Sequence, residues 1–366
     1  MSRGGSTLSR VPQEVGEPLS ALRVWVLTEG RAGDDGQLLR LADALGWECT
    51  ALALAGNTNW HLVLDRLRDL LGWGAPPVRL PEDAPDEWPD LVLAIAGRSV
   101  STVRRIVTAS GGATRSVHLG RPVADLGSFD LVVTTPQYGL PAGRNVVRTA
   151  LPFAPPARPP VGTPEGTPFG GLPRPWTAVL VGGDSGSYRV GAASTQRLIA
   201  ACHKATADGG SVLVTTSPRT PEAVGRALQD ALPERGYFYA FARDDPDNPY
   251  AALLAFADRF VVTGESASLI AEAAAMERPV EVVPVEERPL AGLLVRGHRA
   301  LKRSPLGPLL DRLCARGLWV PPRDLEALHS AFVARGQAGS GEAELETVLE
   351  RIREVVRGAP RARRRA

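Results

Sequence analysis

Cysteine is scarce in this 366-residue chain, and its three cysteines lie far apart, at Cys49, Cys202 and Cys314. No CxxC pair and no cluster of Cys with His occurs, so we expect neither a disulfide framework nor a zinc site. Long apolar runs are also missing, because none reaches the ~18 residues that a membrane-spanning helix needs. The first twenty residues lack the apolar core of a secretory signal. We therefore expect a cytoplasmic protein.

An excess of basic charge is confined to one end of the chain. In total, 42 basic residues stand against 40 acidic ones, but no acid follows Glu354, and five arginines do: Arg357, Arg361, Arg363, Arg364 and Arg365. Without these five the body of the chain is slightly acidic, so we expect no nucleic-acid partner. The arginine-rich tail is either a solvated end or a weak peripheral contact with anionic lipid at the inner membrane.

Short apolar segments alternate with helical patterns in two successive series, which start at residues 22–28 and 176–181. Nine prolines between the two series prevent a helix or a central strand from continuing. Strands alternating with helices predict parallel sheets covered on both faces. We expect a disordered start (1–20), two Rossmann-like domains (21–151 and 176–335) joined by a Pro-rich linker (152–175), and a C-terminal helix with the arginine-rich tail (336–366).

A glycine-rich turn, GGDSGSY at residues 182–188, follows the first strand of the second series. Gly183 and Gly186 would let backbone amides approach a ligand, and the next helix would turn its positive end toward an anion. Ser185 could donate a hydrogen bond to a phosphate oxygen. The alternative is an ordinary tight turn with a helix cap, since the motif is neither the Walker pattern nor GxGxxG.

A second polar turn, TGESAS at residues 263–268, separates a strand from a helix that carries Glu272. Ligands of open α/β sheets bind at the carboxyl ends of strands, which is where Ser266 would lie. The carboxylate of Glu272 could accept hydrogen bonds from both hydroxyls of a ribose. The alternative is a helix cap followed by an acidic first turn.

The first domain has its own glycine-rich turn, EGRAGDDGQ, ahead of a helix that we expect at residues 37–45. Gly30 and Gly33 would permit a close approach, with Arg31 beside them. Asp34 could act as the general base toward an acceptor hydroxyl. The alternative is a solvated turn in which an aspartate caps the helix.

Two arginines, Arg98 and Arg219, follow apolar strands. Each could bind phosphate or carboxylate through two hydrogen bonds, or be an ordinary surface arginine. The five histidines have no ligand spacing, so we expect no bound metal. His118, at a strand end, is the one histidine placed to line a cleft. No GxSxG elbow is present to support a Ser-His-Asp triad.

The second half of the chain resembles the donor domain of the peptidoglycan N-acetylglucosaminyltransferase that makes lipid II. The similar segments are residues 179–186 (VLVGGDSG), 250–258 (YAALLAFAD), 259–272 and 273–279 (AAAMERP). In those enzymes the first loop faces the diphosphate and the glutamate of the last motif holds the ribose. The resemblance therefore implies these roles for Gly183, Ser185, Gly186 and Glu272.

Over residues 22–290 the chain is more similar to the mitochondrial-fission-ELM-like family, a bacterial group akin to a plant mitochondrial fission factor. The matching segments are GRAGD with Gln37, Gly97-Arg98, FDLVVTTP (129–136), RNVVRT (144–149), GGDS (182–185), SPRTP (217–221), NPY (248–250) and residues 261–272. Their order and spacing imply a GT-B-like fold.

The chain departs from both groups at three places. Its first glycine-rich turn lacks the histidine that the lipid II enzyme has there. Glu265-Ser266 stands where the family often has Asp-Ser, and Gln137-Tyr138 stands where many relatives have His-Asp. The first departure puts the acceptor chemistry of the lipid II enzyme in question for this chain.

Together these observations predict a GT-B-like α/β protein with two Rossmann-like, doubly wound domains facing each other across a cleft. The C-terminal domain would bind a nucleoside diphosphate-sugar as substrate, with no further cofactor. The N-terminal domain would present an unknown, envelope-related acceptor beside Gly30, Arg31, Gly33 and Arg98, with Asp34 as base. Backbone dipoles rather than a metal would stabilise the leaving diphosphate, which Gly183, Ser185, Gly186 and Arg219 would hold. Ser266 and Glu272 complete the predicted nucleotide-sugar site.

Two alternatives stay open. A non-catalytic scaffold of the mitochondrial-fission-ELM-like family would keep the fold as an interaction module, and the missing histidine favours it. A nucleotide-sugar epimerase of the same shape would need carboxylates and His118 close to the sugar ring.

Overall fold

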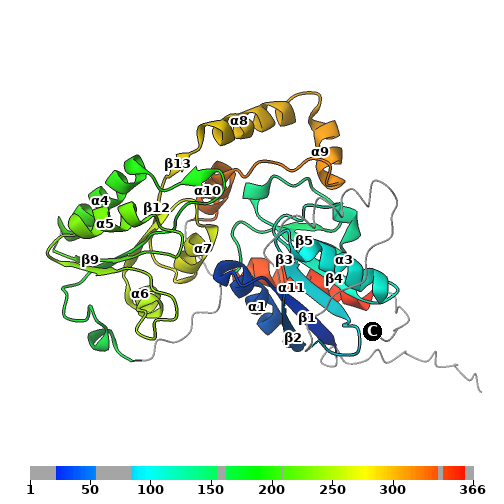
Figure 1. The fold of residues 1–366 in the computed structure, drawn as a ribbon, viewed down its shortest axis with the longest axis horizontal. Helices are drawn as coiled ribbons and strands as arrows, with labels where there is room; N and C mark the ends of the chain where they lie inside the picture. Colours follow the sequence, from blue (N-terminus) through cyan, green and yellow to red (C-terminus); the bar gives the residue numbers. More distant parts are fainter. Residues whose placement is uncertain (1–21, 55–83, 155–161, 208, 337–340, 359–366) are drawn as a thin grey trace, which may run out of the picture.

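Two sheets of parallel strands organise the chain, which the computed structural model describes over residues 22–54, 84–154, 162–207, 209–336 and 341–358. In spatial order the first sheet holds β2 (Glu48–Ala53), β1 (Arg23–Thr28), β3 (Leu91–Ile95), β4 (Arg115–Leu119), β5 (Leu131–Thr134) and β6 (Val146–Arg148). The second holds β10 (Gly236–Tyr239), β9 (Ser211–Thr215), β7 (Trp176–Leu180), β11 (Arg259–Thr263) and β12 (Val280–Val283). Figure 1 shows the two sheets in separate lobes, here called the N-terminal and C-terminal lobes.

The N-terminal sheet is apolar on both faces because successive residues of a strand point to opposite sides. In β1, Val24 and Val26 face a core shared with α1 (Ala32–Leu45) and α11 (Glu342–Arg357). Trp25 of the same strand faces the opposite core, which α3 (Ser99–Ala109) covers. The last described helix, α11, therefore packs against the first lobe.

The C-terminal sheet is built in the same way. Val179 of β7 packs in a core with α4 (Ala192–Ala207) and α5 (Glu222–Asp230). Leu180 packs on the other face with α6 (Tyr250–Phe256), α7 (Ala267–Ala275) and α10 (Leu325–Ala334). A short antiparallel pair, β8 (Tyr188–Arg189) with β13 (Glu286–Glu287), is attached to this lobe.

After β13 the chain leaves the C-terminal lobe. Helices α8 (Pro289–Arg303) and α9 (Gly307–Ala315) form a hairpin along the upper edge in Figure 1. The hairpin reaches the N-terminal lobe, where the backbone of Gly317 lies against that of Ala124. The chain then returns to the C-terminal lobe as α10 and crosses again to reach α11. Among the described residues, no helix is long and apolar enough to cross a membrane.

One local expectation differs from the structure. The first glycine-rich turn is shorter than expected, because α1 begins at Ala32 rather than at Gln37. Gly33 therefore lies in the first turn of a helix. The described part of the Pro-rich segment packs onto the C-terminal lobe, where Phe169 contacts Trp176 edge-on with ring centroids 5.1 Å apart.

Candidate functional site

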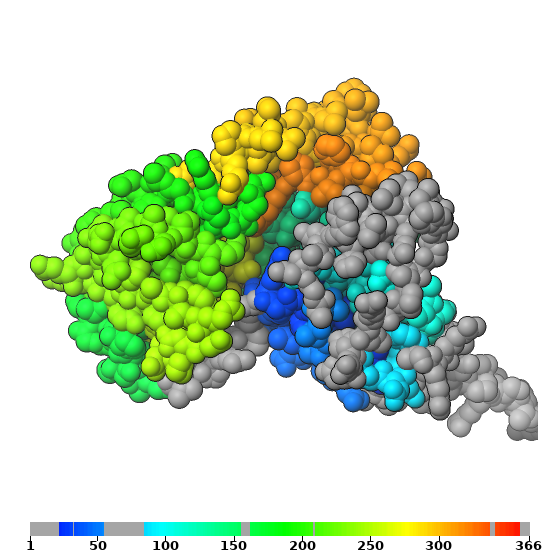
Figure 2. Space-filling view, viewed as in Figure 1, coloured from blue at the N-terminus to red at the C-terminus, as the bar shows by residue number. Residues whose placement is uncertain are grey.

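Loops at the carboxyl ends of strands from both sheets meet between the lobes, where Figure 2 shows a hollow beneath the α8–α9 hairpin. Arg323, just before α10, joins three of these loops through its guanidinium group. Its Nε donates to Gln137 Oε1 at 2.6 Å, its Nη1 to Ser185 Oγ at 2.8 Å and its Nη2 to Glu265 O at 2.7 Å. One side chain thus connects the loops after β5, β7 and β11.

Two half-buried arginines share this crevice. Arg121 lies over the Tyr138 ring, 5.4 Å from its centroid, and also donates to Pro321 O. Burial lowers the pKa of both Arg121 and Arg323. The charge of Arg323 lowers the pKa of Arg121 further, and the charge of Arg219 lowers that of Arg323. No ion pair joins either of them to a carboxylate in the described part of the chain. Half-buried cations without a carboxylate partner are suited to binding an anion.

The Gly182-Gly183 turn packs tightly against neighbouring loops. A Cβ on Gly183 would lie 1.9 Å from the Arg219 carbonyl oxygen, and one on Gly182 would lie 2.0 Å from Glu265 Oε1. The Gly182 N–H donates to Thr263 Oγ1 at 2.8 Å, and the Gly183 N–H donates to Glu265 Oε1 at 2.7 Å. The amide of Gly183, expected to meet the diphosphate, is therefore already engaged in this structure.

Glu265 is fully buried beneath this turn. Burial raises the pKa of its carboxyl, although Arg219 acts in the opposite direction. Its second oxygen, Oε2, is buried without a hydrogen-bond partner. From the sequence we could locate the turn that contains Glu265. The sequence did not indicate that the carboxylate of Glu265 binds the Gly183 amide.

The remainder of the 182–188 turn is closed by backbone hydrogen bonds in both directions between Ser185 and Tyr188, at 3.0 and 3.1 Å. Gly186 adopts a left-handed conformation, with φ of 56°, at the tip. Asp184, whose charge would repel a phosphate, forms an ion pair with Arg288 at 3.1 Å. The Ser185 hydroxyl is held toward the crevice by its bond from Arg323.

The second turn leads into α7. Ser266 is buried and precedes the helix, but its side chain makes no capping hydrogen bond. Glu272 lies farther along α7, where its Oε2 accepts a hydrogen bond of 2.6 Å from the Tyr250 hydroxyl. Burial raises the pKa of the Glu272 carboxyl, while that hydrogen bond opposes the shift. One of its two oxygens is thus occupied, which the sequence pattern did not indicate.

The N-terminal lobe approaches the crevice through the first turn of α1. A Cβ on Gly33 would lie 2.8 Å from Ser268 Oγ of the other lobe, so a glycine permits this contact. Burial raises the pKa of Asp34, whose carboxylate lies 3.8 Å from Arg31 Nη1. Asp34 also interacts electrostatically with Arg219 of the C-terminal lobe.

The other two predicted acceptor-side residues lie differently. Gly30 has a φ of 75° and open space around it. Arg98 forms an ion pair of 2.9 Å with the buried Glu29, and its Nη2 donates to the Glu29 carbonyl oxygen at 3.0 Å. Glu29 Oε1 also accepts from the Ser99 N–H at 2.9 Å. Arg98 therefore fixes the turn after β1, and its role toward an acceptor stays a prediction.

The expectation that His118 lines a cleft is wrong. Its side chain is fully buried in the N-terminal sheet, with its ring centroid 5.1 Å from that of Phe129. Its Nε2 is 2.9 Å from Ala96 O, and burial lowers its pKa to about 4. The ring is therefore not accessible to a ligand in the crevice in this structure.

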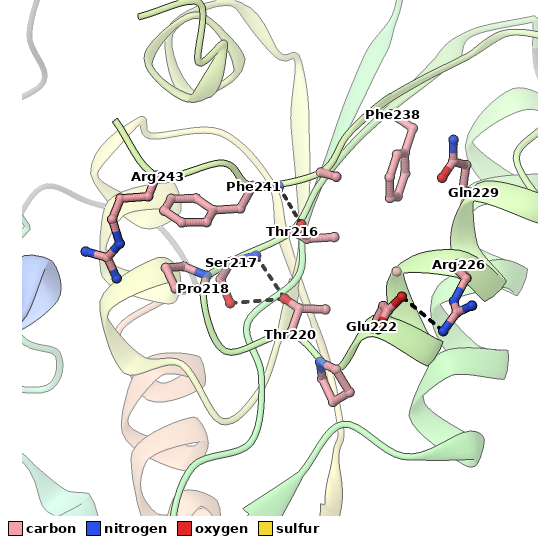
Figure 3. Close-up of a pocket in the computed structure, with 13 residues that line it drawn as sticks. Thr216, Ser217, Pro218, Thr220, Glu222, Arg226, Gln229, Phe238, Phe241 and Arg243 are labelled. Carbon is pink, nitrogen blue, oxygen red and sulfur yellow. Dashed lines mark hydrogen bonds and ion pairs between the residues drawn. The ribbon is translucent and has the colours of Figure 1, made fainter. Parts of the chain in front are cut away.

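A pocket of about 480 Å³ opens at the carboxyl ends of β9 and β10, beside the Gly182-Gly183 turn (Figure 3). Phe241 and Arg243 lie on one side of it, and Phe238 and Gln229 on another. Thr220, also in its lining, donates its hydroxyl hydrogen toward Gly182 O at 2.5 Å. The pocket and the crevice are therefore separated by the thickness of a single loop.

The two parallel-stranded lobes and the polar crevice between them define a GT-B-like α/β protein with a candidate anion site. The model of a protein family described as "Mitochondrial fission ELM1" matches residues 32–307, and the chain belongs to that family. The family resemblance noted in the sequence is thus confirmed. The chain is 37% identical over 115 residues to "Mitochondrial fission protein ELM1" of Arabidopsis thaliana, a match that covers 31% of this chain and 27% of that protein.

Solved structures with a similar course of the chain have low sequence identity. MurG of Acinetobacter baumannii is 14% identical, with 91% of this chain and 99% of that chain covered and a TM-score of 0.41. The UDP-GlcNAc 2-epimerase of Neisseria meningitidis, bound to UDP-GlcNAc, is 11% identical, with 91% and 100% covered and a TM-score of 0.43.

Proposed function

We propose that this chain binds a nucleoside diphosphate-sugar in the crevice and transfers the sugar to an acceptor presented by the N-terminal lobe. The observation that carries the proposal is the position of Arg323, which joins three strand-end loops without a carboxylate ion pair. A diphosphate would receive charge-assisted hydrogen bonds from Arg323, with Arg121 and the exposed Arg219 nearby. In this proposal arginines, rather than a metal ion, offset the charge of the leaving diphosphate.

The nucleoside would extend along the C-terminal lobe. The free oxygen of Glu272 is the group that would accept a hydrogen bond from a ribose hydroxyl. The pocket beside Phe241 and Arg243 offers flat apolar and cationic surfaces, which suit a planar base. Gly186 and Ser266 would border the donor site, as the sequence pattern predicts.

Asp34 is the proposed general base. Its raised pKa increases its affinity for the proton that it would take from an acceptor hydroxyl. The acceptor oxygen would then bond to the anomeric carbon of the sugar. The bond from that carbon to the diphosphate would break, and its electron pair would leave with the nucleoside diphosphate. Gly30 and Arg31 border the space in which such an acceptor would lie.

A second candidate function is a non-catalytic interaction module of the same fold. One specific observation favours it: the Gly183 amide is engaged by Glu265, so a phosphate would have to displace that carboxylate to use it. The epimerase alternative loses its support, because its proposed catalytic histidine, His118, is fully buried.

Titration calorimetry with a panel of UDP-, GDP- and TDP-sugars separates the two functions. We expect one member to bind to the wild-type protein, and Glu272→Ala to weaken that binding at least about tenfold, which corresponds to ~1.4 kcal/mol. Glu281→Ala, at an exposed glutamate of the same lobe, is the matched control and should bind normally. Absence of binding to every member at about millimolar ligand rejects the donor site and leaves the interaction module.

A further inference from the structure

Exposed apolar side chains are concentrated on the α8–α9 hairpin. Of the nine large hydrophobic residues that are exposed in the described part of the chain, seven lie between residues 290 and 319. We call them the hairpin surface: Leu290, Leu293, Leu294, Leu306, Leu309, Leu318 and Trp319. Scattered exposed leucines are ordinary in soluble proteins, whereas seven exposed apolar residues within thirty positions make this segment a candidate contact surface.

The spacing along α8 places the three leucines of this helix on one face. Leu290, Leu293 and Leu294 follow the i, i+3, i+4 pattern of a helical stripe, and they are 70%, 60% and 54% exposed. Gly292 and Val295, on the opposite side of α8, are buried. The helix therefore packs against the protein with one side and leaves an apolar stripe toward solvent. Along the upper edge of the molecule, α9 continues this surface (Figures 1 and 2).

The charges on the same hairpin have one sign. Exposed arginines accompany the leucines at Arg296, Arg303, Arg312 and Arg316. Asp311 is the one acidic residue from 289 to 319, and it is paired with Lys302. Among the described residues no ion pair is found for these four arginines, whereas Arg288, at the start of the hairpin, is paired with Asp184. The hairpin thus presents leucines together with four exposed, unpaired arginines.

We propose that the hairpin surface binds the face of a bilayer rich in anionic phospholipid. Helices with an apolar stripe and a cationic border lie in the plane of a membrane, with the apolar side chains among the upper acyl chains. Arginines near an anionic surface add electrostatic attraction to the burial of the apolar side chains. A second copy of the chain is a poorer occupant, because two hairpin surfaces face to face would bring like charges together. The proposal does not depend on what the crevice binds.

Sedimentation with vesicles tests this surface in the full-length protein. Vesicles of phosphatidylcholine with about 30% phosphatidylglycerol should bind the wild type, and vesicles of phosphatidylcholine alone should bind it weakly. The variant L290S/L293S/L294S and the variant R296Q/R303Q/R312Q should each lose at least about tenfold in partitioning. These positions are exposed, so thermal unfolding should be unchanged in both variants.

Matched controls use exposed residues outside the hairpin. The variant L39S/V333S removes the other two exposed large hydrophobic residues, and R235Q removes an exposed arginine of the C-terminal lobe. Both should bind vesicles as the wild type does. A variant with the four arginines at 361, 363, 364 and 365 changed to glutamine tests the tail. Binding that disappears in this variant and persists in both hairpin variants overturns the proposal.

A depth-sensitive readout distinguishes insertion from simple electrostatic adhesion. Trp319 is 40% exposed on the hairpin surface, so brominated acyl chains should quench part of the tryptophan emission. The quenched part should disappear in Trp319→Phe, while vesicle binding remains. Equal quenching in the wild type and in this variant, or a failure of the wild type to bind anionic vesicles, refutes the proposal. Lipid-independent dimers that the L290S/L293S/L294S variant abolishes would also refute it, in favour of a second copy.

Discussion

Arg323 and Gln137 connect the two lobes through a side-chain hydrogen bond of 2.6 Å. The neighbouring backbone supports the same contact, because the Asp324 N–H donates to the Gln137 carbonyl oxygen at 2.8 Å. Gln137 lies in a short helical turn, Pro136–Tyr138, after β5, and Arg323 lies ahead of α10. The same residues therefore form a contact between the lobes and part of the candidate anion site.

Two substitutions of Gln137 should distinguish the contact between the lobes from the binding of an anion at Arg323. Gln137→Ala leaves the half-buried Nε of Arg323 without an acceptor, so we expect a loss of about 1–3 kcal/mol in the free energy of unfolding. Gln137→Glu instead gives Arg323 a carboxylate partner. It should retain stability but weaken any anion that binds at Arg323. Denaturant unfolding measures the stability of Gln137→Ala, and calorimetry with nucleoside diphosphates measures anion binding by Gln137→Glu. If Gln137→Ala is as stable as the wild type, Gln137 does not hold the lobes together.

Gly183 should not tolerate any side chain. A Cβ there would lie 1.9 Å from the Arg219 carbonyl oxygen, which belongs to backbone and cannot turn away. We expect Gly183→Ala to lower the free energy of unfolding by at least about 2 kcal/mol. Gly171→Ala is the matched control, because a Cβ at that glycine meets no atom within 4 Å. Urea denaturation of both variants measures the difference in stability. Equal stabilities would contradict the prediction, because they would mean that the Gly183 turn can move away from the Arg219 backbone at no cost.

His118 should make stability depend on pH in the acidic range. Burial lowers its pKa from 6.5 to about 4, so between these values the unfolded chain binds a proton that the folded chain does not. The free energy of unfolding should therefore fall as the pH is lowered from 6.5 toward 4, by up to about 3 kcal/mol from this group. His118→Gln, whose amide can still donate to Ala96 O, should have a shallower slope. An unchanged slope in this variant would assign the pH dependence to other groups.

The strands and most of the helices that pack on them could be predicted from the sequence. The central strands, such as β3, β7 and β9, are short apolar runs that are buried on both faces. Turns at strand ends could be located for the same reason. The residues that complete the crevice could not be found in this way. Arg323 follows a helix hairpin rather than a strand, and its partners Gln137 and Ser185 are separated from it by 186 and 138 residues.

The roles of single side chains at the site could not be predicted either, because they depend on contacts between residues that are far apart in the sequence. Glu265 reaches the Gly183 amide from another loop, and Tyr250 reaches Glu272 from another helix. The helices α8 and α9 were not expected. Leu290, Leu293 and Leu294 of α8 have helical spacing, but the structure leaves this stripe exposed instead of packing it on a sheet. Residues 290–319 differ from the rest of the described chain in that many of their large apolar side chains are exposed.

Arg98 and Arg219 follow comparable strands, and the structure predicts opposite consequences for their loss. Arg98 is the cationic partner of Glu29, whose side chain is 1% exposed, so Arg98→Met would leave a buried carboxylate without its counter-charge. We expect a loss of about 3 kcal/mol in the free energy of unfolding, because removing one partner of a buried ion pair is strongly destabilising. The double variant Arg98→Met with Glu29→Gln should recover part of that loss.

Arg219 is exposed and forms no ion pair with a carboxylate in the described part of the chain. Arg219→Met should therefore change the free energy of unfolding by less than about 0.5 kcal/mol. Chemical denaturation of the three variants measures these differences, and a stability loss of the same size in Arg219→Met would mean that Arg219, too, supports the fold rather than a ligand.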